Sequence, residues 1–198
     1  MFNISIRLDE QLVFGGKPYQ LFLSFDNVLR VFDLWQDPKI QIQYKPKFAI
    51  RLLTRTNDFD DLDFETQLHV YEEVFNKHID TSKSDETGVR YDLEGNPLPV
   101  KPKKQQKGQK ILFNIGYDSE YIYAGFMQAY GIDLIDQQGK LNWKKFNALL
   151  VGLPSDTRFA EILKIRAWEP SGESAKEKRI MRERQDEVAL PAHLQKYD

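Results

Sequence analysis

The sequence predicts a mainly α-helical protein: two small helical units, an N-terminal β-hairpin and a polar linker joining the units. Three observations predict this architecture. Apolar residues recur at helical spacing in two parts of the chain, Gly15-Gly16 interrupts an early apolar segment, and a polar, proline-containing stretch separates the two helical parts. The expected segments are 1–80 (hairpin and helices), 81–110 (flexible linker or long loop), 111–170 (three-helix unit) and 171–198 (charged helix and tail).

The composition limits the classes of protein that the chain can belong to. Of its 198 residues, 41% are apolar, which is enough for a core, and none is Cys, which excludes disulfide scaffolds and cysteine chemistry. A net charge of -2 argues against a general nucleic-acid binder. The N-terminus has no signal-peptide pattern, and no apolar run approaches the ~20 residues that span a bilayer. We therefore expect a soluble, intracellular protein without membrane contact.

The N-terminal part begins with strand-like patterns. Residues 2–8 alternate apolar and polar side chains, as a half-buried strand does. Residues 12–21 carry Gly15-Gly16 between apolar ends, which is typical of a tight hairpin turn. A lone hairpin is only marginally stable, so this one must pack on something else.

Three helices are expected between this hairpin and residue 80. The first is capped by Ser24, carries apolar residues at helical spacing and ends before Pro38. The second lies within 39–55 and begins near Pro46, and the third runs near 63–79. Between them lies an acidic run over 57–65, which could be a metal-binding loop. A loop followed by an acidic first helical turn is the favoured interpretation, because no Gly occupies the calcium-loop position.

The linker at 81–110 is polar and contains several prolines, so it cannot bury enough apolar surface to offset its chain entropy. It carries a basic cluster, which could contact nucleic acid or an acidic partner. A solvated linker is the favoured interpretation. The cluster consists of Lys101, Lys103, Lys104, Lys107 and Lys110.

Short helices follow in the C-terminal part. One is capped by Asp118 and ends at Gly131, a second runs from near Asn142 to Pro154, and a third is capped by Ser155 or Asp156. Because the connections are short, we expect these three helices to pack as neighbours.

A fourth helix, over 173–190, is strongly charged, and Ser174 and Glu177 have the spacing of a capping box. Its apolar stripe is thin, so it could be a solvated lever or an element that gains its packing from a partner.

No pattern of catalytic chemistry emerges. The chain has no HExxH, no GxxxxGK[ST], no GxGxxG and no GxSxG. His69 and His78 are nine residues apart, which does not put two imidazoles on one helix face. We therefore expect a protein that is not an enzyme, with no catalytic residue, no cofactor and no metal.

Aromatic residues are frequent, at 13% of the chain. Those near Tyr117 to Tyr130 could stack on bases, but aromatics at helical spacing are more often core or protein-contact residues. Four aromatic residues lie beyond the best core positions and are candidates for partner contacts. They are Trp35, Tyr123, Tyr130 and Trp168.

The C-terminal half also carries a family resemblance. Its most specific motif is Trp143-x-x-Phe146-x-x-Leu149-Leu150-x-Gly152-Leu153 followed by Asp156-Thr157. Further matches are Tyr117-Asp118, Tyr121 to Phe126 and Tyr130 to Leu134, and, more loosely, Gly16-Lys17-x-Tyr19 and Phe25-x-x-Val28-Leu29-x-Val31-Phe32. On these residues the chain resembles a family of small proteins encoded just upstream of the tape-measure protein in long-tailed bacteriophages of Gram-positive hosts. Members of that family are regarded as tail assembly chaperones.

The resemblance implies a role in virion morphogenesis. A chaperone of this family would bind the tape-measure protein, keep it soluble in the host cell cytoplasm, and be absent from the mature virion. The major tail protein is a further candidate partner, self-association is expected, and no catalytic residue is carried over.

A helix-binding groove would provide the recognition. The candidate lining residues are Phe126, Trp143, Phe146, Leu150 and Phe159. The same five could instead simply form the core of the C-terminal unit.

Two other functions fit the sequence. The protein could be a permanent virion component, such as a tail completion or connector protein. It could also be a nucleic-acid-binding regulator that uses the basic cluster of the linker.

Overall fold

The structure is a computed structural model that describes residues 5, 7–80, 90–91, 94, 97–98 and 111–194. The chain forms two compact units. Unit 1 comprises Met1–Val100 and Ile135–Val151, and unit 2 comprises Lys101–Leu134 and Gly152–Asp198. The fold is mainly helical with an N-terminal antiparallel hairpin, which confirms the predicted class.

The hairpin consists of β1 (Gln11–Phe14) and β2 (Lys17–Gln20). Gly15 and Gly16 form its two-residue turn with φ of 57° and 78°, the positive values that such tight turns require. Phe14 and Tyr19 place their ring centroids 5.4 and 4.7 Å from that of Phe59, so the hairpin packs on the turn between the second and third helices of unit 1. The predicted strand at 2–8 lies mostly outside the described residues, and residues 7–10 are not in a strand.

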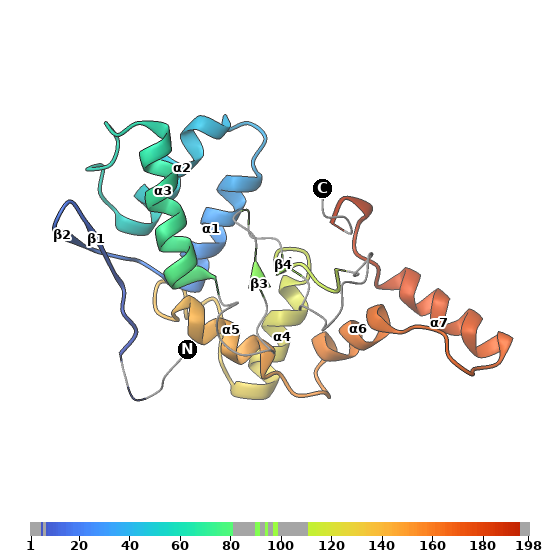
Figure 1. The fold of residues 1–198 in the computed structure, drawn as a ribbon. Helices are drawn as coiled ribbons and strands as arrows, with labels where there is room; N and C mark the ends of the chain where they lie inside the picture. The colour runs from blue at the N-terminus through green and yellow to red at the C-terminus, as the bar shows by residue number, and fades with distance from the viewer. Residues whose placement is uncertain are drawn as a thin grey trace. The chain divides into compact units, whose positions relative to one another are not determined.

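Helices α1 (Phe25–Gln36), α2 (Lys45–Thr54) and α3 (Phe64–Val74) pack in sequence order, α1 on α2 and α2 on α3 (Figure 1). A short 3-10 turn, η1 (Ile42–Tyr44), leads into α2, and the π-helix η2 (Phe75–Ile79) continues α3. The buried Asn27 amide donates to the Phe22 and Leu52 carbonyls at 2.7 and 2.9 Å. It thereby ties α1 both to the chain leading into it and to α2.

The acidic run before α3 forms a turn, and three of its carboxylates make contacts within unit 1. Asp63 caps α3 by accepting from a backbone N–H three residues later at 2.9 Å. Asp58 accepts from the Lys17 ammonium at 2.6 Å, and this contact, reinforced by other hydrogen bonds, lowers the pKa of Asp58 to about 2. Asp60 accepts from the Arg51 guanidinium at 2.7 Å. These contacts join the turn to β2 and to α2.

Parts of the predicted linker at 81–110 are described. The short strands β3 (Arg90–Tyr91) and β4 (Pro97–Leu98) pair antiparallel in unit 1. The Gln36 side chain donates to the Glu94 carbonyl at 3.0 Å, which ties this pair to the end of α1. The rest of that segment, including the basic cluster, lies outside the described residues.

Helix α5 (Trp143–Val151) belongs to unit 1, whereas the short connections in the sequence predict that it packs with the helices on either side of it in the chain. The reason is a set of long-range contacts. The Trp143 backbone N–H donates to the Leu23 carbonyl at 2.7 Å, and its indole N–H donates to the Ile79 carbonyl at 2.9 Å. An antiparallel bridge between Ser24 and Asn142 lies beside them. The chain thus returns to unit 1 to complete its core.

Unit 2 is built from α4 (Ser119–Tyr130), α6 (Arg158–Ala167), α7 (Ala175–Glu187) and the 3-10 turn η3 (Ala192–Leu194). Helix α6 packs on α4 and lies beside α7 (Figure 1). Gly131, with φ of 62°, ends α4 as predicted. The cap of α6 is Thr157 rather than the expected Ser155 or Asp156, because it is the Thr157 hydroxyl that accepts from the first helical turn. The capping box at the start of α7 is confirmed.

Candidate functional site

Three of the five predicted groove residues form the core of unit 1. Trp143, Phe146 and Leu150 all lie on the inner face of α5 and are at most 3% exposed. Phe146 stacks on Phe25 with ring centroids 4.9 Å apart, and Trp143 meets Phe32 edge to face at 5.5 Å. These ring contacts pack α5 against α1 in the core of unit 1.

The other two predicted groove residues lie in the core of unit 2. Phe126, on α4, is 0% exposed and meets Tyr130 edge to face, and Phe159, on α6, is 3% exposed and meets Phe113 in the same way. The five residues are therefore divided between two cores, and none offers a surface to a partner in this structure. Their role in partner binding stays a prediction.

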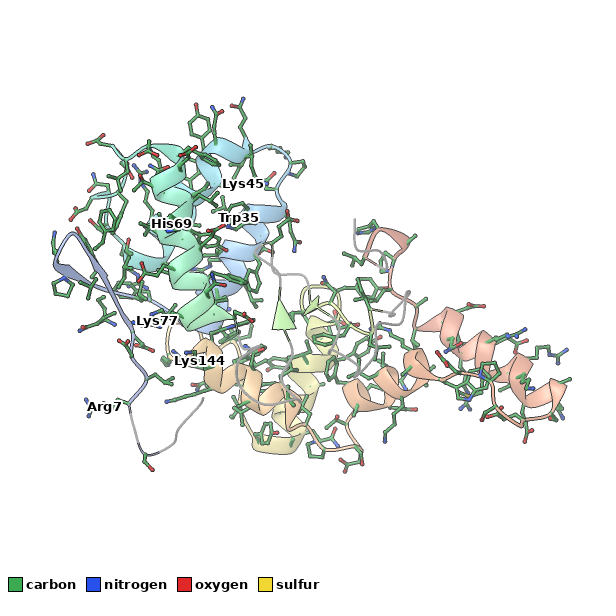
Figure 2. The ribbon with its side chains drawn as sticks, in the orientation of Figure 1. Arg7, Trp35, Lys45, His69, Lys77 and Lys144 are labelled. Carbon is green, nitrogen blue, oxygen red and sulfur yellow. The ribbon has the colours of Figure 1, made fainter. Side chains whose placement is uncertain are left out.

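The four aromatic candidates for partner contacts are also buried or half-buried within the protein. Trp35 is buried and stacks on Tyr71 at 5.0 Å, and the Lys45 ammonium donates to its carbonyl (Figure 2). Tyr123 donates to an Asp133 carboxylate oxygen at 3.0 Å. Tyr130 is half-buried, and this burial raises the pKa of its phenol. Trp168 is half-buried.

The outer side of α4 is the surface that the sequence analysis missed. We define the α4 face as the exposed residues Tyr117, Glu120, Ala124, Met127 and Gln128. The four that belong to the helix recur at helical spacing, and Tyr117 directly precedes it. Tyr117 is 50% exposed and Met127 is 43% exposed, although each is large and apolar. Glu120 is the single charged residue of α4. The helix thus presents a nearly uncharged face to solvent, and the signal for it is the absence of charge opposite the buried stripe.

A buried ion pair positions α4. The Arg166 guanidinium donates to both oxygens of Asp118 at 2.8 Å, and the two side chains are 4% and 0% exposed. Arg166 also donates to the carbonyls of Leu112 and Val188, and the second Asp118 oxygen accepts from the Asn114 N–H. The pair therefore joins the start of α4, helix α6 and the chain beyond α7. Because the contact is bidentate and each group has further hydrogen-bond partners, the arrangement is a structural tie rather than a reactive site.

Close packing positions α4 from its inner side as well. A Cβ atom built on Gly125 would lie 3.2 Å from a methyl carbon of Leu153, so α4 comes tightly against the loop before α6. The Gln128 side chain reaches the Asp156 carbonyl of the same loop. The contacts of Gly125 and Gln128 fix the rotation of α4 about its axis, so that Ala124 and Met127 face solvent.

Unit 1 holds a second group of charges, where η2 meets α5. The Lys77 ammonium lies 3.0 Å from an Asp9 carboxylate oxygen, and the Lys144 ammonium donates to the Lys77 carbonyl at 3.1 Å (Figure 2). Burial, together with the Lys144 and Lys77 charges, lowers the pKa of the buried His78. Burial also lowers the pKa of Lys144, and the hydrogen bond from Lys77 lowers that of Asp9. These interactions join the chain before β1 to η2 and η2 to α5.

No metal-binding arrangement is found in the part of the chain that the structure describes, since no three His, Asp or Glu side chains gather there. Within the same residues, no helix has the length and hydropathy that crossing a bilayer requires.

The fold and the surface together define a mainly helical protein in which one nearly uncharged helix face is left exposed. The family model described as Bacteriophage Gp15 protein matches residues 8–190. The chain therefore belongs to this bacteriophage protein family. No curated protein and no solved structure matches it.

Proposed function

We propose that the protein is a tail assembly chaperone that binds the tape-measure protein and keeps it soluble during tail morphogenesis. Family membership makes it a phage protein, and the sequence resemblance connects it with tail assembly. In this proposal it acts by binding and not by catalysis. It works in the host cell cytoplasm and leaves before the virion is complete.

The observation that carries the proposal is the α4 face. A tape-measure protein is long, helical and apolar, so its chaperone needs an exposed surface that accepts an apolar helix. Met127 supplies a flexible side chain that adapts to varied partners, and Tyr117 supplies large contact area at low entropic cost. Ala124 lets a partner helix approach closely. The single carboxylate of Glu120 leaves little desolvation cost on docking.

Co-expression with a fragment of the tape-measure protein tests this proposal. The wild-type protein should keep the fragment in the soluble fraction. Met127→Glu and Ala124→Glu should each lower that fraction, because they place a charge where an apolar helix would dock. Ile42→Glu is the matched control, since Ile42 is 60% exposed and lies on η1 of unit 1. A fragment that precipitates equally with and without the wild-type protein would overturn the proposal. If the soluble fraction stayed unchanged with both α4 variants, the α4 face would not be the surface that binds the fragment.

Mass spectrometry of purified particles tests the proposed fate. A chaperone should be missing from mature virions while present in infected cells. Stoichiometric recovery from particles would instead support a permanent tail or connector protein.

A further inference from the structure

Helix α7 presents a charged outer face that its own unit does not cover. None of its residues is buried. One side faces the rest of unit 2, because Gln185 donates to the Ile165 and Trp168 carbonyls at 2.9 and 2.8 Å. Lys178, Met181 and Val188 lie on that same side and are half-buried. The opposite side is exposed, and we call it the α7 stripe: Lys176, Arg179, Ile180, Glu183 and Glu187.

Charge is segregated along the α7 stripe. The two basic residues come first, Ile180 lies near the middle and is 38% exposed, and the two acidic residues come last. A helix carries partial positive charge at its N-terminus and partial negative charge at its C-terminus. The stripe therefore places each charge at the end where it is less favourable. Within α7 the stripe has one exposed ion pair, Arg179 with Glu183 at 3.6 Å, and such exposed pairs contribute little. The order of the charges is therefore better matched to a partner outside the helix than to the helix itself.

We propose that the α7 stripe pairs with the α7 stripe of a second copy of this chain, antiparallel about a two-fold axis. Such an axis at the midpoint of the stripe, between residues 181 and 182, puts Lys176 opposite Glu187 of the other copy and Arg179 within one residue of the position opposite its Glu183. Each such contact occurs twice, and the two Ile180 side chains meet near the axis. A parallel pairing would instead place like charges together. The stripe is thus complementary to itself in one direction only.

The expected association is weak. Helix α7 has 13 residues and is therefore ~20 Å long. A pair of such helices buries less than the ~1,200 Å² at the lower end of stable interfaces, and its charged contacts are solvent-exposed. Dimerisation should therefore depend on protein concentration and weaken as salt is added. This inference does not rest on the proposed function.

Sedimentation equilibrium of the full chain tests the pairing. The wild-type protein should dimerise at about 50 mM salt and dissociate at about 500 mM, because salt screens exposed charge pairs. Lys176→Glu with Arg179→Glu makes the stripe acidic throughout, and Glu183→Lys with Glu187→Lys makes it basic throughout. Each double variant alone should stay monomeric under conditions in which the wild type dimerises. An equimolar mixture of the two should form a heterodimer, and all four changes in one chain should restore the homodimer.

The design separates loss of pairing from loss of folding. Each double variant replaces the charges at one end of α7 by charges that the helix dipole favours there, and circular dichroism should show that the helix content is retained. Lys39→Glu with Lys145→Glu, two exposed sites in unit 1, changes the net charge as much as the acidic variant and should leave dimerisation intact. A wild-type protein that stays monomeric at low salt would overturn the proposal. So would a dimer that both stripe variants retain.

Discussion

Unit 1 and unit 2 hold their helices together in different ways. Most of the buried apolar side chains among the described residues lie in unit 1, where ring contacts join α1, α3 and α5. Unit 2 has a thinner apolar core, and a bidentate ion pair lies within it. Because a small core supplies little stability, we expect unit 2 to depend on that pair more than unit 1 depends on any one of its described polar contacts. The more dependent unit is also the one that exposes the α4 face and the α7 stripe.

Asp118→Ala should produce the largest effect, the opening of unit 2. It leaves the Arg166 guanidinium buried without its carboxylate, which typically costs ~3–5 kcal/mol. Hydrogen exchange of α4 and α6 amides should accelerate strongly, while α1 and α3 keep their protection. The control is Arg158→Ala, which removes an exposed pair with Glu161 and should change little. Unchanged protection of α4 in Asp118→Ala would show that the pair does not hold unit 2 together.

Trp143→Ala should weaken unit 1 by ~3–5 kcal/mol, the usual cost of removing a buried Trp side chain. The denser core should still fold, so exchange should rise in α1 and α5 without full loss of protection. Lys145→Ala, exposed on the same helix, is the control. If α4 and α6 lost protection in place of α1, the assignment of α5 to unit 1 would be wrong.

The features that were predictable from the sequence are those set by neighbouring residues. Gly15-Gly16 predicts the hairpin because only a few turns join strands through two residues, and Ser174 with Glu177 predicts the start of α7 because a capping box is local. The spacing around Trp143 likewise predicts a helix. It does not reveal that the indole N–H bonds to a carbonyl 64 residues earlier, which places α5 in unit 1.

The candidate site was less predictable for the same reason. Asp118 has the sequence context of a helix cap, but its carboxylate pairs with a guanidinium 48 residues away. Periodicity identifies the apolar face of a helix and not what covers it, so it did not reveal that the five expected groove residues are buried in two separate cores. Their contact with a partner stays a prediction. Met127 lies on the opposite side of α4. A search for uncharged positions that face away from the buried stripe would have found it.

Gln185→Ala should weaken the packing of α7 on the end of α6 and leave the contact between α4 and α6 intact. The Gln185 amide donates to the Ile165 and Trp168 carbonyls at the end of α6, and removing it leaves those acceptors to solvent. We expect a loss of ~1–2 kcal/mol in the docking of α7, which is typical of removing a few hydrogen bonds. Exchange should accelerate in α7 while α4 and α6 stay protected. Arg182→Ala, at an exposed site on the same helix and outside the α7 stripe, should not have this effect.

Mild acid should have the smallest effect and should act on unit 1 through His78. Burial and the nearby Lys144 and Lys77 charges lower its pKa below the ordinary 6.5, although the Asp9 carboxylate opposes part of this shift. Between the lowered pKa and 6.5, the unfolded chain binds more protons at this position than the folded chain does. The free energy of unfolding should therefore fall as the pH drops below about 6.5 and should gain nothing from His78 above it.

Comparing variants isolates the contribution of His78 to this acid sensitivity. His78→Gln removes the titrating group, so its unfolding free energy in urea should fall less than that of the wild type between about pH 7 and pH 5. His69→Gln is the control, because the His69 side chain is 91% exposed and should show the wild-type pH slope. Equal slopes for wild type and His78→Gln would mean that protonation of this imidazole does not limit the stability of unit 1. A reduced slope would show that unit 1, despite its denser apolar core, is also destabilised by a buried titratable group where η2 and α5 meet.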